Sequence, residues 1–311
     1  MSGAWHGEPP RDPALVTALA AVDGWGGREI CCAPIAGGIT NSNWRVRVEG
    51  EPCDLFVKLP GAGTELFIDR GAAHDASVAA ARSGYGARVR HYVPELGVEM
   101  FEFLDGLRPA TNADFQRPTV HRNAVRALRA FNSQPSLRLT KTAFDMIDEH
   151  LETARCLAAA LPDDIDWLLD NYGLARAALE AAGIELAPCM NDTLAANFML
   201  DDSDAVRLVD FEYASNNDIH YELALWLGEM FFEPEVEREA LREYFGTVTE
   251  ASLSRVQVYK ALADIKWATW AMIQRRISPV EFDYHKYGAW KYLRARTMIG
   301  DPRWESWLRR L

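Results

Sequence analysis

Three polar residues, Asp192, Asn197 and Asp210, flank two short apolar segments. Residues 198–200 and 206–209 are separated by turn-forming residues, which predicts an antiparallel hairpin. In such a hairpin the first strand starts beside the end of the second. The amide of Asn197 and the carboxylate of Asp210 should therefore meet at one end, next to the loop that carries Asp192. Oxygen donors of this kind suit Mg²⁺ bound together with phosphate oxygens.

The spacing of the three residues also predicts separate roles. In phosphoryl transfer, one Asp orients the attacking hydroxyl, while an Asn and a second Asp hold the metal. This assigns Asp192 to catalysis and Asn197 and Asp210 to Mg²⁺. A single Asn or Asp at a strand end is more often a turn former. Three of them in this register favour a site of phosphoryl transfer.

The segment around these residues resembles the choline/ethanolamine kinase family, within the aminoglycoside-phosphotransferase and protein-kinase-like group. The resemblance is carried by Met190-Asn191-Asp192, Asn197 and Asp210-Phe211-Glu212-Tyr213, which match the family pattern His-Asn-Asp, Asn and Asp-Phe-Glu-Tyr. It implies an α+β, bilobal protein-kinase-like fold, with a small β-rich N-terminal lobe and a large helical C-terminal lobe. It also implies ATP and Mg²⁺ as cofactors.

Composition limits the class of protein and its partners. Of the 311 residues, 49% are hydrophobic, enough for one large domain or two lobes. The net charge of −12 argues against nucleic acid and membrane surfaces and is compatible with a cationic substrate. Five cysteines without paired metal-ligand spacing fit reduced thiols. The sequence also has no long apolar run, so we expect a cytoplasmic protein.

Two features of the N-terminal region could hold a nucleotide. A glycine-containing turn at 35–43 would let backbone amides approach phosphates, although such turns are common in ordinary hairpins. Lys58, on the apolar strand 55–59, is either a solvated edge residue or the strand lysine that contacts phosphates, and its place after the loop favours the second. The segment 98–106 is similar to the linker between kinase lobes, where backbone groups bind adenine. The expected ATP contacts are Gly37, Gly38, Thr40, Asn41, Ser42, Lys58, Glu102 and Phe103.

The sequence changes character near Gly106, where strand-like patterns give way to helical periodicity. We therefore expect a nucleotide-binding lobe at 1–105, with 1–13 as a loose end. A helical lobe at 106–311 would carry the catalytic loop and the substrate pocket.

Aromatic residues near the C-terminus predict the acceptor. Trp267 and Trp270 are three residues apart and share a helical face, a pattern that is usually core. In the choline kinase family, however, the two Trp and a later Tyr, here Tyr287, form a quaternary ammonium pocket beside a Glu that matches Glu229. Aromatic faces attract a cation that they cannot hydrogen-bond. The resemblance thus implies that choline or a related amino alcohol contacts Glu229, Trp267, Trp270 and Tyr287. Phe232 is three residues after Glu229, so it shares a helical face with Glu229 if the helix continues that far, and we expect it in the same site.

Three positions depart from the family pattern. Met190 replaces a His that braces the catalytic loop, where Glu222 stands for the family's bracing acid. Ala73 occupies the place of the Glu that pairs with the strand lysine, and Leu194 that of a substrate-contacting Gln. Two alternatives therefore stay open: a kinase for an aminoglycoside or sugar, and a catalytically weak kinase-like ligand-binding protein. Also open are the exact acceptor, the partner of Lys58 and the assembly state, a homodimer included.

Overall fold

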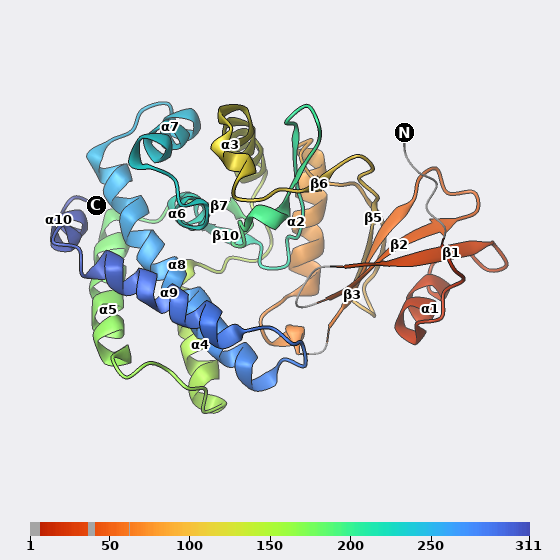
Figure 1. Ribbon diagram of the computed structural model, residues 1–311, viewed down its shortest axis with the longest axis horizontal. Coiled ribbons are helices and arrows are strands. Elements are labelled where there is room, and N and C mark those ends of the chain that lie inside the picture. The colour runs from red at the N-terminus through yellow and green to blue at the C-terminus, as the bar shows by residue number, and fades with distance from the viewer. Residues whose placement is uncertain (1–6, 37–40, 62) are drawn as a thin grey trace.

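The computed structural model describes residues 7–36, 41–61 and 63–311. A small lobe built on a β-sheet lies beside a larger lobe built mainly of helices (Figure 1). The predicted α+β bilobal architecture is therefore confirmed.

An antiparallel sheet with the strand order β1-β2-β3-β5-β4 forms the small lobe. Its strands are β1 (Ile30–Ile35), β2 (Asn41–Val48), β3 (Leu55–Pro60), β4 (Val89–Val93) and β5 (Val98–Glu102). Successive side chains of a strand point to opposite faces. On β3, Val57 is buried in the core of the lobe, and Lys58 points the other way. Helix α1 (Pro13–Ala20) is capped by Asp12 and buries Leu15 in the same core.

The chain before α1 also joins the sheet. Glu8 lies inside the segment expected to be a loose end, yet it exchanges two backbone hydrogen bonds, 2.9 and 2.7 Å long, with Cys32 of β1. The segment around Glu8 is therefore tied to the sheet.

Helix α2 (Arg70–Arg82) lies between the sheet and the helical lobe (Figure 1). Asp69 caps it, accepting a 2.9 Å hydrogen bond from the amide of Ala72. Its buried face is made of small residues, among them Ala73 and Ala76. Small side chains allow close packing, and they leave α2 without a carboxylate at position 73.

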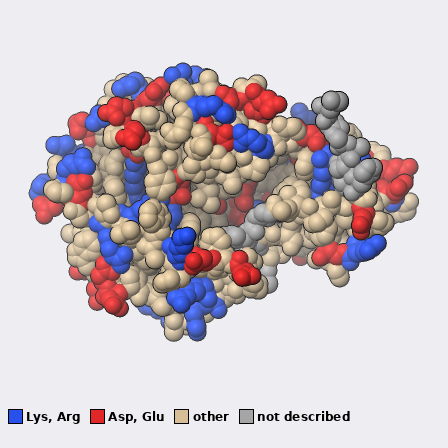
Figure 2. Space-filling view, viewed as in Figure 1, with Lys and Arg blue, Asp and Glu red and all other residues tan. Residues whose placement is uncertain are grey.

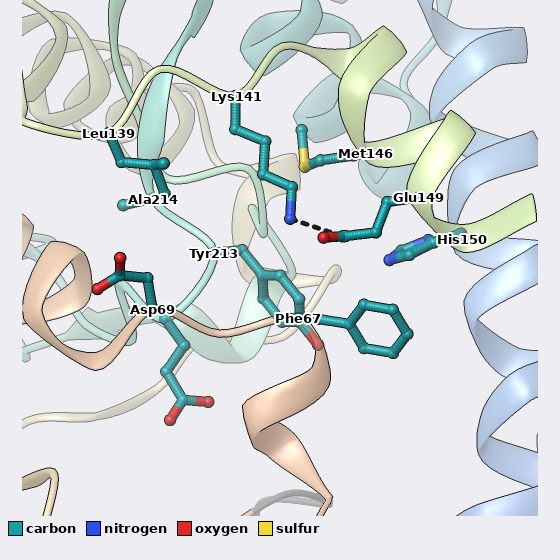
Figure 3. A pocket seen from close by; sticks show the side chains of 10 residues that line it. Phe67, Asp69, Leu139, Lys141, Met146, Glu149, His150, Tyr213 and Ala214 are labelled. Atoms are coloured by element: carbon teal, nitrogen blue, oxygen red, sulfur yellow. Dashed lines mark hydrogen bonds and ion pairs between the residues drawn. The ribbon is translucent and has the colours of Figure 1, made fainter. Parts of the chain in front are cut away.

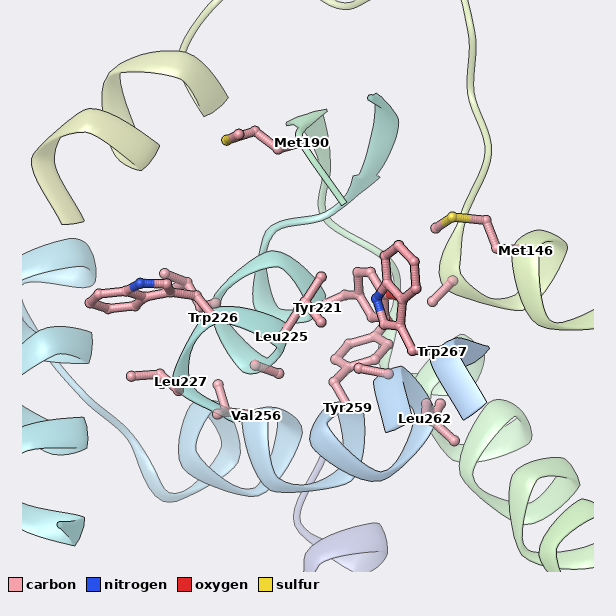
Figure 4. Close-up of a cluster of buried hydrophobic side chains, with 14 of the residues drawn as sticks. Met146, Met190, Tyr221, Leu225, Trp226, Leu227, Val256, Tyr259, Leu262 and Trp267 are labelled. Atoms are coloured by element: carbon pink, nitrogen blue, oxygen red, sulfur yellow. The ribbon is translucent and has the colours of Figure 1, made fainter. Parts of the chain in front are cut away.

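The large lobe is organised around α8 (Glu250–Ile277), which packs against α4, α6 and α9. Figure 4 shows Tyr259, Leu262 and Trp267 of α8 close to Tyr221 and Leu225 of α6. Residues 261–273 of α8 are all buried, and most of them are apolar, as a helix inside the core requires. The helices of this lobe are α3 (Pro118–Asn132), α4 (Ala143–Cys156), α5 (Ile165–Ala182), α6 (Ile219–Met230), α7 (Pro234–Phe245), α8, α9 (Tyr284–Ile299) and α10 (Trp304–Arg309).

Across the described residues, no helix combines the length and the apolar character needed to cross a lipid bilayer.

The predicted hairpin is present, and it faces the small lobe. Strands β8 (Phe198–Leu200) and β9 (Val206–Leu208) are antiparallel, and the amide of Val209 donates a 2.9 Å hydrogen bond to the carbonyl of Asn197. Asp201 holds the turn by accepting 2.8 Å hydrogen bonds from the amides of Ser203 and Ala205. The remaining strands are β6 (Arg108–Pro109), which pairs with β8, and β7 (Leu186–Cys189), which pairs with β10 (Ser215–Asp218).

Candidate active site

The face of the molecule in Figure 2 is hollowed between the two lobes, and acidic side chains are visible inside the hollow. Asp192 and Asn197 lie together: the Asn197 amide donates to the backbone carbonyl of Asp192 at 2.8 Å and to its carboxylate at 3.2 Å. Burial, and then the nearby carboxylate of Asp210, raise the pKa of Asp192 to about 7, against the opposing effect of Lys266. A carboxylate with a pKa near neutrality can accept a proton from an alcohol in its reach.

Buried hydrogen bonds hold the loop that carries Asp192. The buried carboxylate of Glu222 accepts hydrogen bonds from the amides of Met190 (2.7 Å) and Asn191 (2.9 Å). Burial raises the pKa of Glu222 to about 7. The Asn191 side chain donates to the carbonyl of Tyr213 at 2.9 Å. Met190 itself is fully buried in the core (Figure 4), so its backbone, rather than its side chain, connects the loop to the brace.

Two residues of this region have left-handed backbones. Asn191 has a φ of 60° and Asp210 a φ of 68°. Asn and Asp tolerate this conformation better than other residues that carry a side chain. The residue types at these positions therefore suit the turns that orient the loop of Asp192 and the carboxylate of Asp210.

Lys58 reaches across the cleft to the large lobe. Its Nζ lies 2.7 Å from Asp210 and 3.2 Å from Glu212. Glu212 also receives the Asn41 amide, 3.0 Å from each carboxylate oxygen, and the guanidinium of Arg70. Burial would raise the pKa of Glu212, but Lys58 and Arg70 outweigh it, and the pKa is lowered.

These contacts identify the partner of Lys58 that the sequence left open. Asp210 and Glu212 take the place of the helix glutamate that Ala73 replaces. Sequence analysis missed the roles of Glu212 and Arg70. The available signals were the position of Glu212 two residues after Asp210, and that of Arg70 directly after the helix cap Asp69.

The expected nucleotide contacts are only partly placed. Gly37, Gly38 and Thr40 lie outside the described residues. Asn41 points to Glu212, whereas Ser42 is exposed on β2.

Two backbone amides of the linker are already paired. The amide of Glu102 donates to the carbonyl of Arg88 at 2.9 Å, and that of Phe103 donates to the carbonyl of Asp54 at 2.8 Å. Because sheet-like pairing continues through Phe103, neither N–H group is free for adenine in this conformation. The ring of Phe103 is covered by the guanidinium of Arg45, 4.0 Å from the ring centre.

The aromatic residues expected to bind the acceptor form a cluster of nearly perpendicular rings. Ring centres are 5.4 Å apart for Trp267 and Trp270, and 6.3 Å apart for Trp270 and Tyr287. Tyr213, which sequence analysis did not include, joins the cluster 5.3 Å from Trp267. Its place directly after Asp210-Phe211-Glu212 was the signal in the sequence.

Phe232 is not part of this cluster. Its ring packs 5.5 Å from Trp226 and 5.9 Å from His121, in the core. Helix α6 ends at Met230, and Phe231 adopts a left-handed conformation, so the spacing of three residues from Glu229 no longer means a shared face. The assignment of Phe232 to the acceptor site therefore differs from the structure.

Glu229 is close enough to act on the pKa values of Asp192 and Tyr287, but it is already paired with two cations. The ammonium of Lys291 contacts its carboxylate, and the guanidinium of Arg294 lies 3.3 Å away. Both cations also reach Asp264, at 3.5 and 3.0 Å.

A cavity borders the site on the side of α4 (Figure 3). The ion pair between Lys141 and Glu149, 2.6 Å long, lies in its wall. Its lining residues are Phe67, Asp69, Leu139, Lys141, Met146, Glu149, His150, Glu212, Tyr213 and Ala214.

The residues expected to hold Mg²⁺ fit that ion by the chemistry of their donors. The backbone bond from Val209 to Asn197 keeps Asn197 next to Asp210. The repulsion between Asp192 and Asp210, visible in the raised pKa of Asp192, is of the kind that a divalent cation relieves. Within the described part of the chain, no group of three or more His, Cys, Asp or Glu side chains forms a metal site by itself. The amide oxygen of Asn197 and phosphate oxygens would complete the ligand set.

Comparison with known proteins agrees with this geometry. The model of the phosphotransferase enzyme family matches residues 32–259, which include both lobes and the catalytic loop but not the Trp267 cluster. The chain is 26% identical over 290 residues to a probable ethanolamine kinase of Arabidopsis thaliana, covering 83% of this chain and 76% of that protein.

Two solved structures are similar over most of their length. A choline/ethanolamine kinase family protein from Mesorhizobium loti has a TM-score of 0.80 and 27% identity, covering 95% of this chain and 97% of that one. The Streptococcus pneumoniae choline kinase LicA in complex with AMP has a TM-score of 0.74 and 20% identity, covering 88% and 93%, which shows likeness of fold. With the family model matched over most of its length, this chain belongs to the phosphotransferase enzyme family.

Proposed function

We propose that the protein transfers the γ-phosphoryl group of ATP, with Mg²⁺, to the hydroxyl of choline, ethanolamine or a related amino alcohol. The observation that carries this proposal is the convergence of Asp192, Asn197, Asp210 and Lys58 from two lobes on one cleft. The similarity to choline and ethanolamine kinases supports the acceptor class, and the structure of LicA with AMP supports a nucleotide.

Each residue has a role that its surroundings support. Asp192 orients the acceptor hydroxyl and takes up its proton, for which a pKa of about 7 is suited. Lys58 binds phosphate oxygens and is kept in place by Glu212. Asn197 and Asp210 would hold Mg²⁺, which supplies charge neutralisation on the transferred group. Because the transition state is loose, catalysis depends mainly on this placement of charge.

The pairing of Lys58 bears on the alternative of a catalytically weak binding protein. That alternative was motivated by two departures from the family pattern, the missing helix glutamate at Ala73 and Met190 in place of the His that braces the loop. Since Asp210 and Glu212 orient Lys58 instead, the substitution at Ala73 no longer argues against turnover.

The proposal is tested by measuring ADP formation from ATP and Mg²⁺ with choline, ethanolamine, an aminoglycoside or no acceptor. We expect turnover that depends on an amino alcohol and is lost in Asp192→Asn. The matched control is Asp202→Asn, the same change at an exposed position in the hairpin turn, which should leave the rate unaltered. Turnover only with the aminoglycoside, or undiminished turnover in Asp192→Asn, would contradict the proposal.

A further inference from the structure

Lys266 has an unusual environment for a lysine. It lies on α8, its side chain is fully buried, and its Nζ makes no hydrogen bond with any residue that the structure describes. Instead, the nitrogen lies 3.2 Å from the centre of the Trp267 ring and 4.5 Å from that of Tyr213. The lysine therefore covers faces of two rings of the acceptor cluster.

The same nitrogen is near enough to Asp192 for their charges to interact. Burial lowers the pKa of Lys266 well below its ordinary value, and among neighbouring charges the Asp192 carboxylate opposes this fall most strongly. Lys266 therefore interacts with the rings expected to bind the ammonium group of an acceptor. It also interacts with Asp192, the carboxylate expected to orient the hydroxyl of the acceptor.

Glu229, the carboxylate expected to attract a cationic acceptor, has little free negative charge. Glu229 is neutralised by Lys291 and Arg294. A trimethylammonium group has no N–H to donate, so it depends on open ring faces and on nearby negative charge. In this protein, Lys266 covers a face of the Trp267 ring, and the carboxylate of Glu229 is already paired with cations.

A primary ammonium depends less on ring faces. It has three N–H donors and can bind carboxylates, carbonyls or an amine lone pair. Covering a ring face should therefore weaken the binding of a primary ammonium less than that of a trimethylammonium group.

We propose that Lys266 is a specificity-determining residue of the acceptor site, which covers the ring faces of Trp267 and Tyr213 and so favours a primary over a quaternary ammonium acceptor. This inference rests on the proposed function. It makes ethanolamine or another primary amino alcohol, rather than choline, the preferred acceptor.

The test compares kcat/KM for ethanolamine and choline in the wild type, Lys266→Ala and Lys266→Met. The wild type should prefer ethanolamine. Lys266→Ala opens the Trp267 face and should shift the ratio toward choline by about tenfold, the scale of one desolvated cation–π contact. Lys266→Met keeps a long side chain over the ring, so its ratio should stay near that of the wild type. Lys286→Ala, which removes an exposed lysine on α9, is the matched control.

Three outcomes would overturn the inference: a wild type that prefers choline, an unchanged ratio in Lys266→Ala, or an equal shift in Lys266→Met. Calorimetric binding of both amines to the wild type and to Lys266→Met tests the same preference if the alanine variant does not fold. Binding also separates the two proposals. Absence of turnover with every acceptor contradicts the proposed function, whereas tighter binding of choline than of ethanolamine contradicts the role of Lys266.

Discussion

The phosphoryl-transfer end of the cleft and the acceptor end are stabilised in different ways. At the first, charged groups from both lobes pair across the cleft: Lys58 with Asp210 and Glu212, and Arg70 with Glu212. At the second, the aromatic rings and charges come from the large lobe alone, mostly from helices, with Trp267 and Lys266 on α8 and Lys291 on α9. Tyr213 joins them from the turn after β9. The first end depends on how the lobes meet and the second on how two helices pack, so substitutions should affect the two ends separately.

Loss of Asp210 should have the largest effect. Asp210→Ala removes both a predicted metal ligand and a partner of Lys58, so kcat/KM should fall by about 100- to 1,000-fold for every acceptor. The measurement is ADP formation with each acceptor in turn. A loss confined to one acceptor would show that the two ends are not separate.

Glu212→Gln should have a smaller effect at the same end. The substitution removes the negative charge that Lys58 and Arg70 share. We therefore expect KM for ATP to rise by about tenfold, with little change in acceptor selectivity. Glu65→Gln, at an exposed position, serves as the control. An unchanged KM for ATP would remove Glu212 from the set of residues that position Lys58.

Trp270→Leu and Phe232→Leu sharpen the comparison at the acceptor end. Trp270 lies in the ring cluster, so its loss should raise KM for the acceptor by about tenfold while KM for ATP stays constant. Phe232 packs in the core, so its substitution should lower stability by about 1 kcal/mol and leave both KM values within about twofold. Equal effects of the two variants on acceptor KM would place Phe232 in the acceptor site after all.

The last prediction concerns stability as a function of pH. The pKa of Asp192 is raised to about 7 in the folded protein and is ordinary in the unfolded chain. Between about pH 4 and pH 7 the folded state therefore holds a proton that the unfolded state releases, and stability decreases as pH rises through this range. Urea unfolding at pH 5 and pH 7.5, without nucleotide or metal, should show a shallower decrease in Asp192→Asn than in the wild type. Parallel decreases would show that Asp192 has no raised pKa.

The phosphoryl-transfer end was the more predictable of the two from sequence. Asp192, Asn197 and Asp210 lie around one local hairpin, and the pairing of a hairpin follows from nearby residues. The partner of Lys58 could not be predicted in the same way. It depends on how the two lobes meet, and Glu212 is 154 positions further along the chain.

At the acceptor end, helical spacing predicted correctly that Trp267 and Trp270 lie together, because both are inside one long helix. It was wrong for Phe232, because α6 ends at Met230 and Phe231, rather than the Gly usual at this position, adopts the left-handed conformation that follows the helix. The conformation of the Lys266 side chain could not be predicted from helical periodicity either. Neighbouring residues of a helix point about 100° apart, and only a long, flexible side chain can fold back onto the next ring. The available signal was a lysine directly before Trp267, in a stretch of the helix that is mostly apolar.

The most direct test of the account is the identification of the phosphorylated product. Wild-type protein is incubated with ATP, Mg²⁺ and ethanolamine or choline, and the reaction is followed by ³¹P NMR. The account predicts a new phosphomonoester resonance that appears with ADP in equal amounts, faster with ethanolamine than with choline, and that is missing with Asp192→Asn. ADP formation without a phosphomonoester, or no ADP with either acceptor while ATP binds, would contradict it.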